Sequence, residues 1–562
     1  MPVRFPLFPL FLLLLAGCSN MRQTLGEVYD LADEGGDTVL RDTLRTPQDG
    51  PRVLLIGIDG LGDDRLRELL GAGRMPNLAR FLGADSANAA SGLWRQGYAQ
   101  SDVMGVFPSE TAAGWAAVFT GAPPALNGIP GNEWFSRDSL TFFAPVAESV
   151  DSYEQTITIY TDDFLNRTVQ DTTLFERADR RAHVALAFVY RGADLVSLPN
   201  PADVDDILLS MAQMALLGKD QTELYEEMAE DAYVGVREGF EEHGVPDLQA
   251  VYFPGPDLAA HEYGLDAQAE YLHDEVDHRI GQILGLYRER GLLQDLYVVL
   301  TADHGHTPRP KTDARAMDHE DDLRPIFEGA GVRLRGVRTG ADDEGAYQAA
   351  LAFNGTAAYV YLADRSTCPG EDDACDWARS PREEDVLPVA QALWDASARP
   401  VRPDSLQADS LRADSTQRVA FSLILARTRD AYGVPGPFRA FDGDGLVPLG
   451  PYLARESRAD LHRLEERLGW LTDGPHDRLV GDLILLGTAT DAYALEDRFY
   501  FGHPLRSGHG SASPTDALIP LVLAREGMTG ETLRLRLREA VGDAPTQLDV
   551  TPLVLRLLER AD

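Results

Sequence analysis

Lysine is almost missing from this chain of 562 residues: Lys219 and Lys311 are the only two, which leaves few positions for a catalytic lysine. Arginine makes up the rest of the 51 basic residues, and 90 acidic residues outnumber them, so the formal net charge is −39. A protein this acidic is repelled by nucleic acid and by anionic lipid headgroups. We therefore exclude nucleic-acid binding as its main function and attribute the acidity to solubility.

Long apolar segments are also missing once the N-terminus has passed. No stretch beyond residue 18 reaches the roughly 18 apolar residues that a membrane-spanning helix needs. Arg4 precedes an apolar run over residues 5–15, which is too short to span a bilayer and is typical of a signal peptide. The run ends in Leu15-Ala16-Gly17-Cys18, which resembles the bacterial lipoprotein signal. That resemblance implies cleavage before Cys18 and lipid attachment to its sulfur; an ordinary signal peptide with a cysteine at its cleavage site is the alternative.

The mature protein is therefore expected to be a soluble body on a lipid anchor. We predict a signal peptide over residues 1–17 and a tether over residues 18–50, which are polar and lack apolar periodicity. Ser19 favours sorting to the outer membrane of the bacterial cell envelope, facing the periplasm or the cell surface. No other membrane contact is expected, and the oligomeric state stays open.

Cysteine is scarce as well. Besides Cys18, the chain has only Cys368 and Cys375. Exported proteins meet an oxidising compartment, so we predict a disulfide that closes a small loop between these two residues, with two free thiols as the alternative. No other cysteine or histidine lies nearby in the sequence, which argues against a zinc site there.

Three short, continuous apolar runs are typical of strands that are buried on both faces of a parallel sheet. They span residues 52–58, 248–253 and 296–300. Residues 266–290 have apolar positions at helical spacing, so we place a helix between the second and the third strand. This order indicates an α/β fold with a doubly wound, mostly parallel sheet flanked by helices.

Inserted segments are expected to interrupt this core and to cap it. We predict the first part of the core over residues 51–345, with an inserted segment at about 136–245, and the second part over residues 441–562. Residues 346–440 are expected to form an acidic insertion or cap. The stretch from about 365 to 418 within it is rich in Asp, Glu, Arg, Pro and Ser, which is typical of a flexible surface excursion.

Acidic and histidine side chains follow the predicted strands, at the carboxyl ends where such sheets bind ligands. They are Asp59 after the first strand, Asp257 and His261 after the second, Asp303 and His304 after the third, and His509 before an apolar run at 517–524. Two zinc ions need about six Asp and His ligands that converge from several loops, with an oxygen nucleophile between the metals. The pattern therefore predicts a site for two Zn²⁺ ions.

Thr111 is the candidate nucleophile. The residues after it favour a helix that opens on Thr111 and closes at Gly121. A hydroxyl at this point lies in the positive field of the helix dipole, where charge that develops on a phosphate is stabilised. A metal ion beside the hydroxyl would lower its pKa. A threonine that only caps the helix is the alternative.

Seven stretches of the chain resemble, in their order, the nucleotide pyrophosphatase/phosphodiesterase branch of the alkaline phosphatase superfamily. They are Ile58-Asp59-Gly60, Met75-Pro76-Asn77-Leu78, residues 107–111 with Thr120-Gly121, residues 128–135, residues 256–264, Ala302-Asp303-His304-Gly305, and Gly508-His509-Gly510. The resemblance covers most of the mature chain and implies an alkaline-phosphatase-like fold with inserted cap segments.

The resemblance also implies a division of the metal ligands. Asp257, His261 and His509 would hold one zinc ion, while Asp59, Asp303 and His304 would hold the other, with Thr111 bridging the two. Phosphoryl transfer would pass through a phosphothreonine that water resolves, with net retention at phosphorus.

The chain departs from the family pattern beside the nucleophile. Phosphodiesterases often carry an asparagine three residues after the nucleophile, where this chain has Gly114. Asn132 matches the phosphate-contacting asparagine of related monoesterases, and Arg191 is the closest counterpart of their arginine, but the lysine two residues before it is replaced by Val189. Asn132 and Arg191 are thus the candidate substrate-binding residues.

Four further side chains near these motifs have a functional and a purely structural interpretation, and we expect the structural one. His306 could be a spare ligand, but we expect a surface histidine, and Tyr98, Trp134 and Phe135 could line a leaving-group pocket, but we expect core packing.

We therefore predict zinc-dependent hydrolysis of small phosphoric esters, with phosphodiesters and nucleotide pyrophosphates favoured. A phosphate monoesterase is the first alternative, and a non-catalytic envelope lipoprotein that retains the fold is the second. A sulfatase would need a Cys/Ser-x-Pro-x-Arg stretch, which the chain lacks, and phosphoglycerate mutases usually use manganese and a serine.

Overall fold

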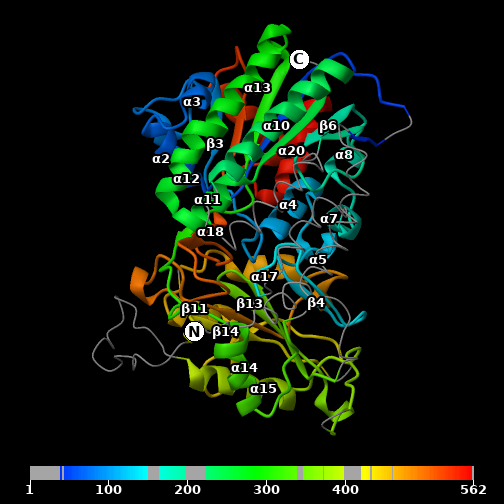
Figure 1. The fold of residues 1–562 in the computed structure, drawn as a ribbon, viewed down its shortest axis with the longest axis vertical. Coiled ribbons are helices and arrows are strands. Elements are labelled where there is room, and N and C mark those ends of the chain that lie inside the picture. Colours follow the sequence, from blue (N-terminus) through cyan, green and yellow to red (C-terminus); the bar gives the residue numbers. More distant parts are fainter. Residues whose placement is uncertain are drawn as a thin grey trace, which may run out of the picture.

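The computed structural model shows two units, with an α/β unit above and a yellow and orange unit below it (Figure 1). It describes residues 38–40, 43–149, 164–197, 222–337, 346–370, 373–397, 419–430, 433–458 and 460–559. The predicted signal peptide over residues 1–17 and the predicted lipidation site Cys18 lie outside this range. No helix in the described part of the chain is long and apolar enough to cross a membrane.

An eight-stranded sheet forms the centre of the α/β unit, in the order β1-β7-β6-β8-β2-β9-β20-β3. The strands are β1 (Thr38–Val39), β7 (Leu195–Ser197), β6 (Ala182–Ala185), β8 (Leu248–Phe253), β2 (Arg52–Ile58), β9 (Leu296–Thr301), β20 (Leu521–Ala524) and β3 (Gly97–Gln100). β7, β6, β8, β2 and β9 run parallel to one another. β1 pairs antiparallel with β7, β20 pairs antiparallel with β9, and β3 pairs antiparallel with β20. The predicted α/β fold with a mostly parallel sheet is confirmed.

Helices cover this sheet in two groups. α10 (Thr222–His243) packs on β6, β7 and β8, and α13 (Asp277–Glu289) packs against α10. α20 (Val550–Glu559) packs on β2 and β9 and against α4 (Thr111–Thr120) and α19 (Gly530–Val541). The other helices of this unit are α2 (Asp63–Gly71), α3 (Pro76–Leu82), α5 (Pro124–Asn127), α7 (Phe164–Thr168), α8 (Leu174–Arg177), α11 (Gly255–Tyr263), α12 (Leu265–Tyr271) and α18 (Pro514–Ala517).

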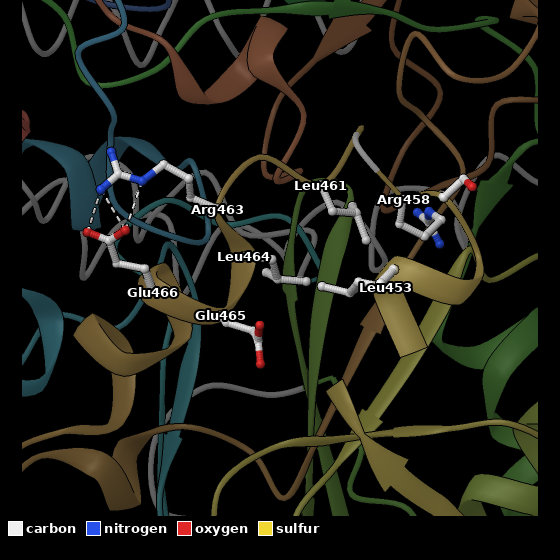
Figure 2. A pocket seen from close by; sticks show the side chains of 9 residues that line it. Leu453, Arg458, Leu461, Arg463, Leu464, Glu465 and Glu466 are labelled. Carbon is white, nitrogen blue, oxygen red and sulfur yellow. Dashed lines mark hydrogen bonds and ion pairs between the residues drawn. The ribbon is translucent and has the colours of Figure 1, made fainter. Parts of the chain in front are cut away.

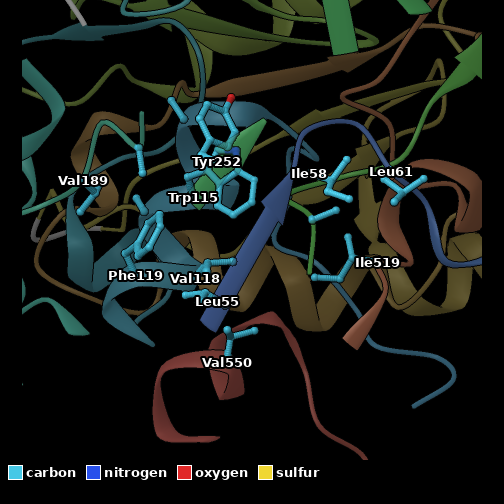
Figure 3. Packing of buried hydrophobic residues seen from close by; sticks show 14 of the residues in the cluster. Leu55, Ile58, Leu61, Trp115, Val118, Phe119, Val189, Tyr252, Ile519 and Val550 are labelled. Atoms are coloured by element: carbon cyan, nitrogen blue, oxygen red, sulfur yellow. The ribbon is translucent and has the colours of Figure 1, made fainter. Parts of the chain in front are cut away.

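A glycine lets α4 approach the central strand β2. Gly57 lies in β2, and a Cβ at this position would come within 2.6 Å of the Trp115 ring of α4. Trp115 also packs edge-on against Tyr252 of β8, with ring centroids 5.1 Å apart, and the neighbouring side chains of α4 lie beside Leu55 (Figure 3). This packing fixes the start of α4, where Thr111 lies, next to the carboxyl end of β2.

The second unit is built on a six-stranded antiparallel sheet, in the order β12-β13-β17-β14-β15-β16. Its strands are β12 (Ala349–Asn354), β13 (Ala357–Leu362), β17 (Leu483–Leu486), β14 (Leu423–Ala426), β15 (Arg439–Phe441) and β16 (Leu446–Pro448). Its helices are α14 (Arg324–Gly329), α15 (Glu383–Ala396), α16 (Leu449–Arg455) and α17 (Leu464–Thr472).

This sheet extends beyond the acidic insertion or cap predicted over residues 346–440, a range that lies between β9 and β20 of the main sheet. The range contributes β12, β13, β14 and part of β15, and the sheet continues past residue 440 into β16 and β17. The stretch from about 365 is not a flexible excursion throughout, because α15 buries Val386, Val389 and Leu393 in a second hydrophobic core. β12 and β13 form a hairpin, but β13 and β14 have their common partner β17 far along the chain, so local composition hid the sheet. Residues 398–418 lie outside the described residues.

Two further boundaries differ from the predicted ones. The inserted segment predicted at about 136–245 supplies β6 and β7 of the main sheet and the long helix α10. The end of the predicted tether over residues 18–50 is also docked, since β1 pairs with β7 and the Arg45 guanidinium forms an ion pair with Asp194 at 2.8 Å. The tether is polar, and the inserted segment contributes only short strands, although it buries many side chains, among them Leu174, Phe188 and Phe240. Strands of three or four residues leave little periodicity in the sequence, which explains why these boundaries were misplaced.

Three small pairs of strands join the loops around the main sheet. β10 (Thr307–Pro308) pairs with β19 (Ser507–Gly508), which brings the loop after His304 beside His509. β11 (Ala316–Met317) pairs with β18 (Tyr500–Phe501), and β4 (Trp134–Ser136) forms a hairpin with β5 (Thr141–Phe143). A disulfide joins the buried residues Cys368 and Cys375.

Candidate active site

Three neighbouring parallel strands bring the predicted ligands together. β8, β2 and β9 are adjacent, so the segments that follow their carboxyl ends meet at one edge of the sheet. Asp59 follows β2, Asp257 and His261 lie on α11 after β8, and Asp303 and His304 follow β9. His509 enters directly after β19. The structure thus gathers all six predicted Asp and His ligands.

The first cluster surrounds the Nε2 atom of His304. This atom lies 3.2 Å from Thr111 Oγ1, 3.5 Å from Asp59 Oδ1 and 3.3 Å from Asp303 Oδ2. All four side chains are buried. Asp303 is held by the backbone N–H of Gly60, which donates to its Oδ1 at 3.1 Å. The hydroxyl of the candidate nucleophile therefore contacts the same histidine nitrogen as two carboxylates.

The second cluster surrounds Asp257. His306 Nε2 lies 2.7 Å from Asp257 Oδ1, His509 Nε2 lies 3.5 Å from the same oxygen, and His261 Nε2 lies 3.3 Å from Oδ2. The Nε2 atoms of His261 and His509 are 3.0 Å apart. The rings of His304 and His509 stack with centroids 3.6 Å apart, so the two clusters adjoin.

The backbone orients three of these histidines in the same way. Nδ1 of His261 donates to the Ser507 carbonyl at 2.9 Å, and Nδ1 of His304 donates to the Gly305 carbonyl at 3.1 Å. Nδ1 of His509 donates to the Ser109 carbonyl at 3.1 Å. A carbonyl oxygen only accepts, so each Nδ1 carries a proton and each Nε2 is the ring nitrogen that faces the cluster. This arrangement is the one that metal-ligating histidines adopt.

Burial and crowding act on the ionisable groups of the first cluster. Burial and the nearby Asp303 and Asp257 carboxylates raise the pKa of Asp59 well above its usual value. Burial also raises the pKa of Asp303 to about 7 and lowers the pKa of His304 to about 3. The protein alone thus disfavours charge on each of these groups, and a bound cation would offset the repulsion between the carboxylates.

The residues present fit metal ions. Asp59 Oδ1 and Asp303 Oδ2 are buried and accept no hydrogen bond from any described residue. Buried carboxylate oxygens without a donor are costly unless an ion or a proton satisfies them. Asp59, Asp303 and His304 form one group whose ligand atoms converge, and Asp257, His304, His306 and His509 form another. These buried clusters are candidate metal sites with the Asp and His donors that zinc takes in proteins.

His306 corrects the prediction of a surface histidine. It is 5% exposed, donates to Asp257 and has Nδ1 within 3.2 Å of Ser507 Oγ. A Cβ at position 60 would come within 2.6 Å of His306 Nε2, so Gly60 leaves room for the ring. The side chain points inward because β10 turns the chain back towards β19 directly after it. The sequence gives no sign of that turn.

Gly114 is explained by close packing against the same loop. A Cβ at this position would come within 2.7 Å of Asp303 Cβ. An asparagine three residues after the nucleophile has no room in this backbone arrangement, and the departure from the family pattern follows from how closely α4 approaches the loop after β9.

Of the two predicted substrate-binding residues, only Asn132 lies at the site. Its Oδ1 accepts from the backbone N–H of Ala112, the residue after Thr111, at 2.9 Å. Its Nδ2 donates to Glu110 and Glu148. Neither glutamate could be recognised from the sequence as a site residue: Glu110 directly precedes Thr111 but has no metal-ligand spacing, and nothing in the sequence marks Glu148.

Arg191 lies in a separate set of contacts. Its Nε donates to Glu176 at 3.0 Å, and its guanidinium also donates to the carbonyl oxygens of Asn166 and Val169 at 3.2 and 2.7 Å. A third carbonyl, that of Asp171, accepts another of its N–H groups. None of the clustered ligands is among these partners, so the contacts indicate that Arg191 ties together the loops around α7 and α8.

The aromatic candidates pack in the hydrophobic core or at the sheet edge. Trp134 stacks on Phe143 with centroids 5.4 Å apart, and Phe135 packs edge-on against Trp377 at 5.0 Å. Tyr98 lies on the edge strand β3 and donates to Gln100 at 2.9 Å. None of these contacts involves the two clusters.

Tyr252 supports the site from the strand below. Its hydroxyl donates to Asp59 Oδ2, while its ring packs against Trp115 of α4. One side chain of β8 thereby touches both a candidate ligand and the helix that carries Thr111. Sequence reasoning missed this residue, because a tyrosine inside an apolar run gives no functional signal.

A pocket in the second unit is separate from this chemistry. Figure 2 shows it between α16 and α17, lined among others by Leu453, Leu461 and Leu464. It contains none of the clustered ligands. Arg463 pairs there with Glu466 at 2.6 Å, so these charges offset each other, and we assign the pocket no part in the reaction.

The model of the type I phosphodiesterase/nucleotide pyrophosphatase family matches residues 53–371. The chain belongs to this family. Family members are phosphoric-ester hydrolases, and this chain is one as well. The matched range contains all the clustered ligands except His509. No curated protein matches the chain.

Solved structures with similar folds are distant. Murine ectonucleotide pyrophosphatase/phosphodiesterase 5 is 15% identical, over 91% of this chain and 95% of its own, with a TM-score of 0.47. An inactive form of it in complex with AMP is 14% identical, over 91% and 96%, with a TM-score of 0.48. Phosphonoacetate hydrolase from Sinorhizobium meliloti 1021 in complex with phosphonoformate is 16% identical, over 93% and 100%, with a TM-score of 0.47.

Proposed function

We propose that this family member hydrolyses phosphodiesters, including nucleotide pyrophosphates, with two zinc ions and Thr111 as the nucleophile. The observation that carries the proposal is the shared position of His304 Nε2, within 3.5 Å of Thr111, Asp59 and Asp303. A hydroxyl in that position lies where the first ion would be held. Asp257, His261 and His509 would hold the second ion, with His306 beside them.

Bound zinc would supply a Lewis acid that lowers the pKa of the Thr111 hydroxyl and offsets charge on the phosphate. Thr111 Oγ1 would attack phosphorus and lose its proton to water, the P–O bond to the leaving alcohol or phosphate group would break, that group would take up a proton from water where it needs one, and a phosphothreonine would form. Water cleaves this intermediate in a second displacement, so the configuration at phosphorus is retained. The chain contributes the position of Thr111 at the N-terminus of α4, where the helix dipole stabilises the developing charge.

A preference for diesters is supported by the scarcity of cations beside Asn132. The two side chains that its Nδ2 contacts are acidic, and the predicted cation Arg191 is engaged elsewhere. A phosphate monoesterase is the second candidate, because Asn132 matches a residue of that class. Bis-p-nitrophenyl phosphate, p-nitrophenyl phosphate and a nucleotide pyrophosphate should be compared side by side. A monoester kcat/KM about a hundredfold above that of the diester would reverse the preference.

Arg191→Ala is expected to leave kcat/KM within about twofold of wild type on both ester classes. The free energy of unfolding should fall by about 1–2 kcal/mol, because the guanidinium holds three backbone carbonyls and a partly exposed ion pair. Steady-state kinetics and denaturant unfolding measure the two effects. A hundredfold loss on the monoester alone would instead make Arg191 a substrate contact.

We also propose that the mature chain is a lipoprotein of the bacterial cell envelope, anchored through Cys18 and facing the periplasm or the cell surface. The Leu-Ala-Gly-Cys stretch after an apolar run supports this proposal. Cys18→Ser is expected to move the protein from the membrane fraction to the soluble fraction or to block processing. Unmodified Cys18 in soluble wild-type protein, seen by mass spectrometry, would contradict the proposal.

A further inference from the structure

The side-chain amide of Asn132 has a fixed orientation beside the nucleophile. Its Oδ1 must be the atom that faces Ala112, because the backbone N–H there can only donate. Its Nδ2 therefore faces the carboxylates of Glu110 and Glu148, the latter with Oε1 at 3.1 Å. The donor that would meet a phosphate oxygen is thus shared with two acidic groups.

Glu148 is held firmly in this position. Its Oε2 accepts from the backbone N–H of Gly355, in the turn between β12 and β13. Its own backbone N–H donates to Glu133 Oε1 at 2.7 Å, and the next residue, Ser149, donates to the same oxygen at 2.8 Å. Glu133 is itself buried and accepts from Phe353 of β12. The second unit thus places a carboxylate beside Asn132.

The two carboxylates meet at the same amide nitrogen but differ in burial. Glu110 is completely buried, and its Oε1 lies 3.2 Å from Nδ1 of the candidate ligand His509. A Cβ at Gly355 would come within 2.6 Å of that oxygen, so Glu110 is enclosed. Glu148 is only partly buried and is therefore the more accessible of the two carboxylates.

No ion pair joins Glu148 to a cation among the described residues. The buried Arg309 is close enough to interact electrostatically with Glu148, but its Nη2 donates to Thr356 Oγ1 and to the His509 carbonyl, so it forms no hydrogen bond with that carboxylate. An ester bound at Thr111 and Asn132 would meet metal ions on one side and the Glu148 carboxylate on the other.

We propose that Glu148 is a specificity-determining residue, whose carboxylate disfavours dianionic phosphate relative to the monoanionic phosphodiester. The inference rests on the proposed function. A monoester carries a second negative charge close to Asn132, and a fixed carboxylate in the same space repels it. Repulsion of the monoester is enough to favour the diester, even if the diester makes no additional contact with the protein.

Glu148→Gln tests this role. Glutamine removes the negative charge and can keep only one of the two accepted hydrogen bonds, so an N–H donor replaces an acceptor beside Asn132. The ratio of kcat/KM for p-nitrophenyl phosphate to that for bis-p-nitrophenyl phosphate is expected to rise about tenfold or more. Glu531→Gln is the matched control: it removes one negative charge from α19, where Glu531 pairs with Arg534, and should leave the ratio unchanged.

Binding of inorganic phosphate gives a second readout that does not depend on turnover. Zinc-loaded Glu148→Gln protein is expected to bind phosphate about tenfold more tightly than wild type in calorimetry, with the Kd of dimethyl phosphate within twofold. Absence of ester turnover together with this shift would sink the proposed function but not the role of Glu148. An unchanged phosphate Kd, or equal shifts for both ligands, overturns the role itself. Glu148→Ala serves if the glutamine variant does not fold.

Discussion

Thr111→Ala is expected to lower kcat for bis-p-nitrophenyl phosphate by about a thousandfold or more, while metal content stays at the wild-type level. Thr111 supplies the hydroxyl that lies 3.2 Å from His304 Nε2, whereas the six Asp and His side chains that would hold the metals remain. The change removes one methyl group and one hydroxyl from the start of α4, so the fold should persist. Single-turnover kinetics and metal analysis measure the two effects.

Two variants sharpen this test. Thr111→Ser keeps a hydroxyl and should retain measurable turnover. Ser109→Ala removes the neighbouring hydroxyl, which donates to the Ser511 carbonyl at 2.9 Å and accepts from Arg467, so it should affect stability more than rate. Wild-type turnover in Thr111→Ala would remove this residue from the mechanism.

Asp257→Asn is expected to cost about one metal ion per chain and about a thousandfold in kcat/KM. The Asp257 carboxylate contacts His306, His261 and His509, and burial alone would raise its pKa, yet His261 and His306 hold the pKa well below its usual value. The carboxylate is thus the anionic centre of the second cluster. Mass spectrometry of the metals and steady-state kinetics measure the outcome.

Asp516→Asn is the matched control for that variant. Asp516 is also a buried carboxylate, but it accepts from Ser511 and Thr307 and belongs to neither candidate metal group. Its replacement should lower the melting temperature and leave the metal content unchanged. If Asp257→Asn kept its full metal content and activity, the assignment of the second cluster would be wrong.

Much of the α/β unit could be predicted because its central strands are continuous apolar runs. β2, β8 and β9 bury both faces, which leaves a signal in the sequence that does not depend on any partner. The residues that follow them must then meet at one edge, so the ligands could be predicted as a set. The helix from Thr111 to Gly121 was marked by its own ends.

The second unit could not be predicted in the same way. β12 pairs with β13 in a hairpin, but β13 and β14 both pair with β17, which lies far along the chain behind polar stretches. β6 and β7 are short, and only the main sheet makes them strands. The average composition around such short strands is dominated by the polar residues beside them, so the strands cannot be recognised from it.

At the active site, the sequence could not predict which way some side chains point. His306 and Glu148 take their roles from turns that bring distant segments together, β10 against β19 and the β12–β13 turn against Asn132. Arg191 was predicted to bind substrate from a family pattern whose lysine is missing in this chain. Its residue type suits that role, but it lies away from the clustered ligands. The roles of these three residues cannot be predicted from residue type and spacing alone.

Metal analysis of the purified chain, coupled to turnover of bis-p-nitrophenyl phosphate before and after chelation, tests whether the protein is a two-zinc hydrolase. We expect about two zinc ions per chain, loss of turnover when a chelator removes them, and recovery when zinc is added back. Turnover that survives complete removal of metal, or a fully active protein that binds none, would contradict it.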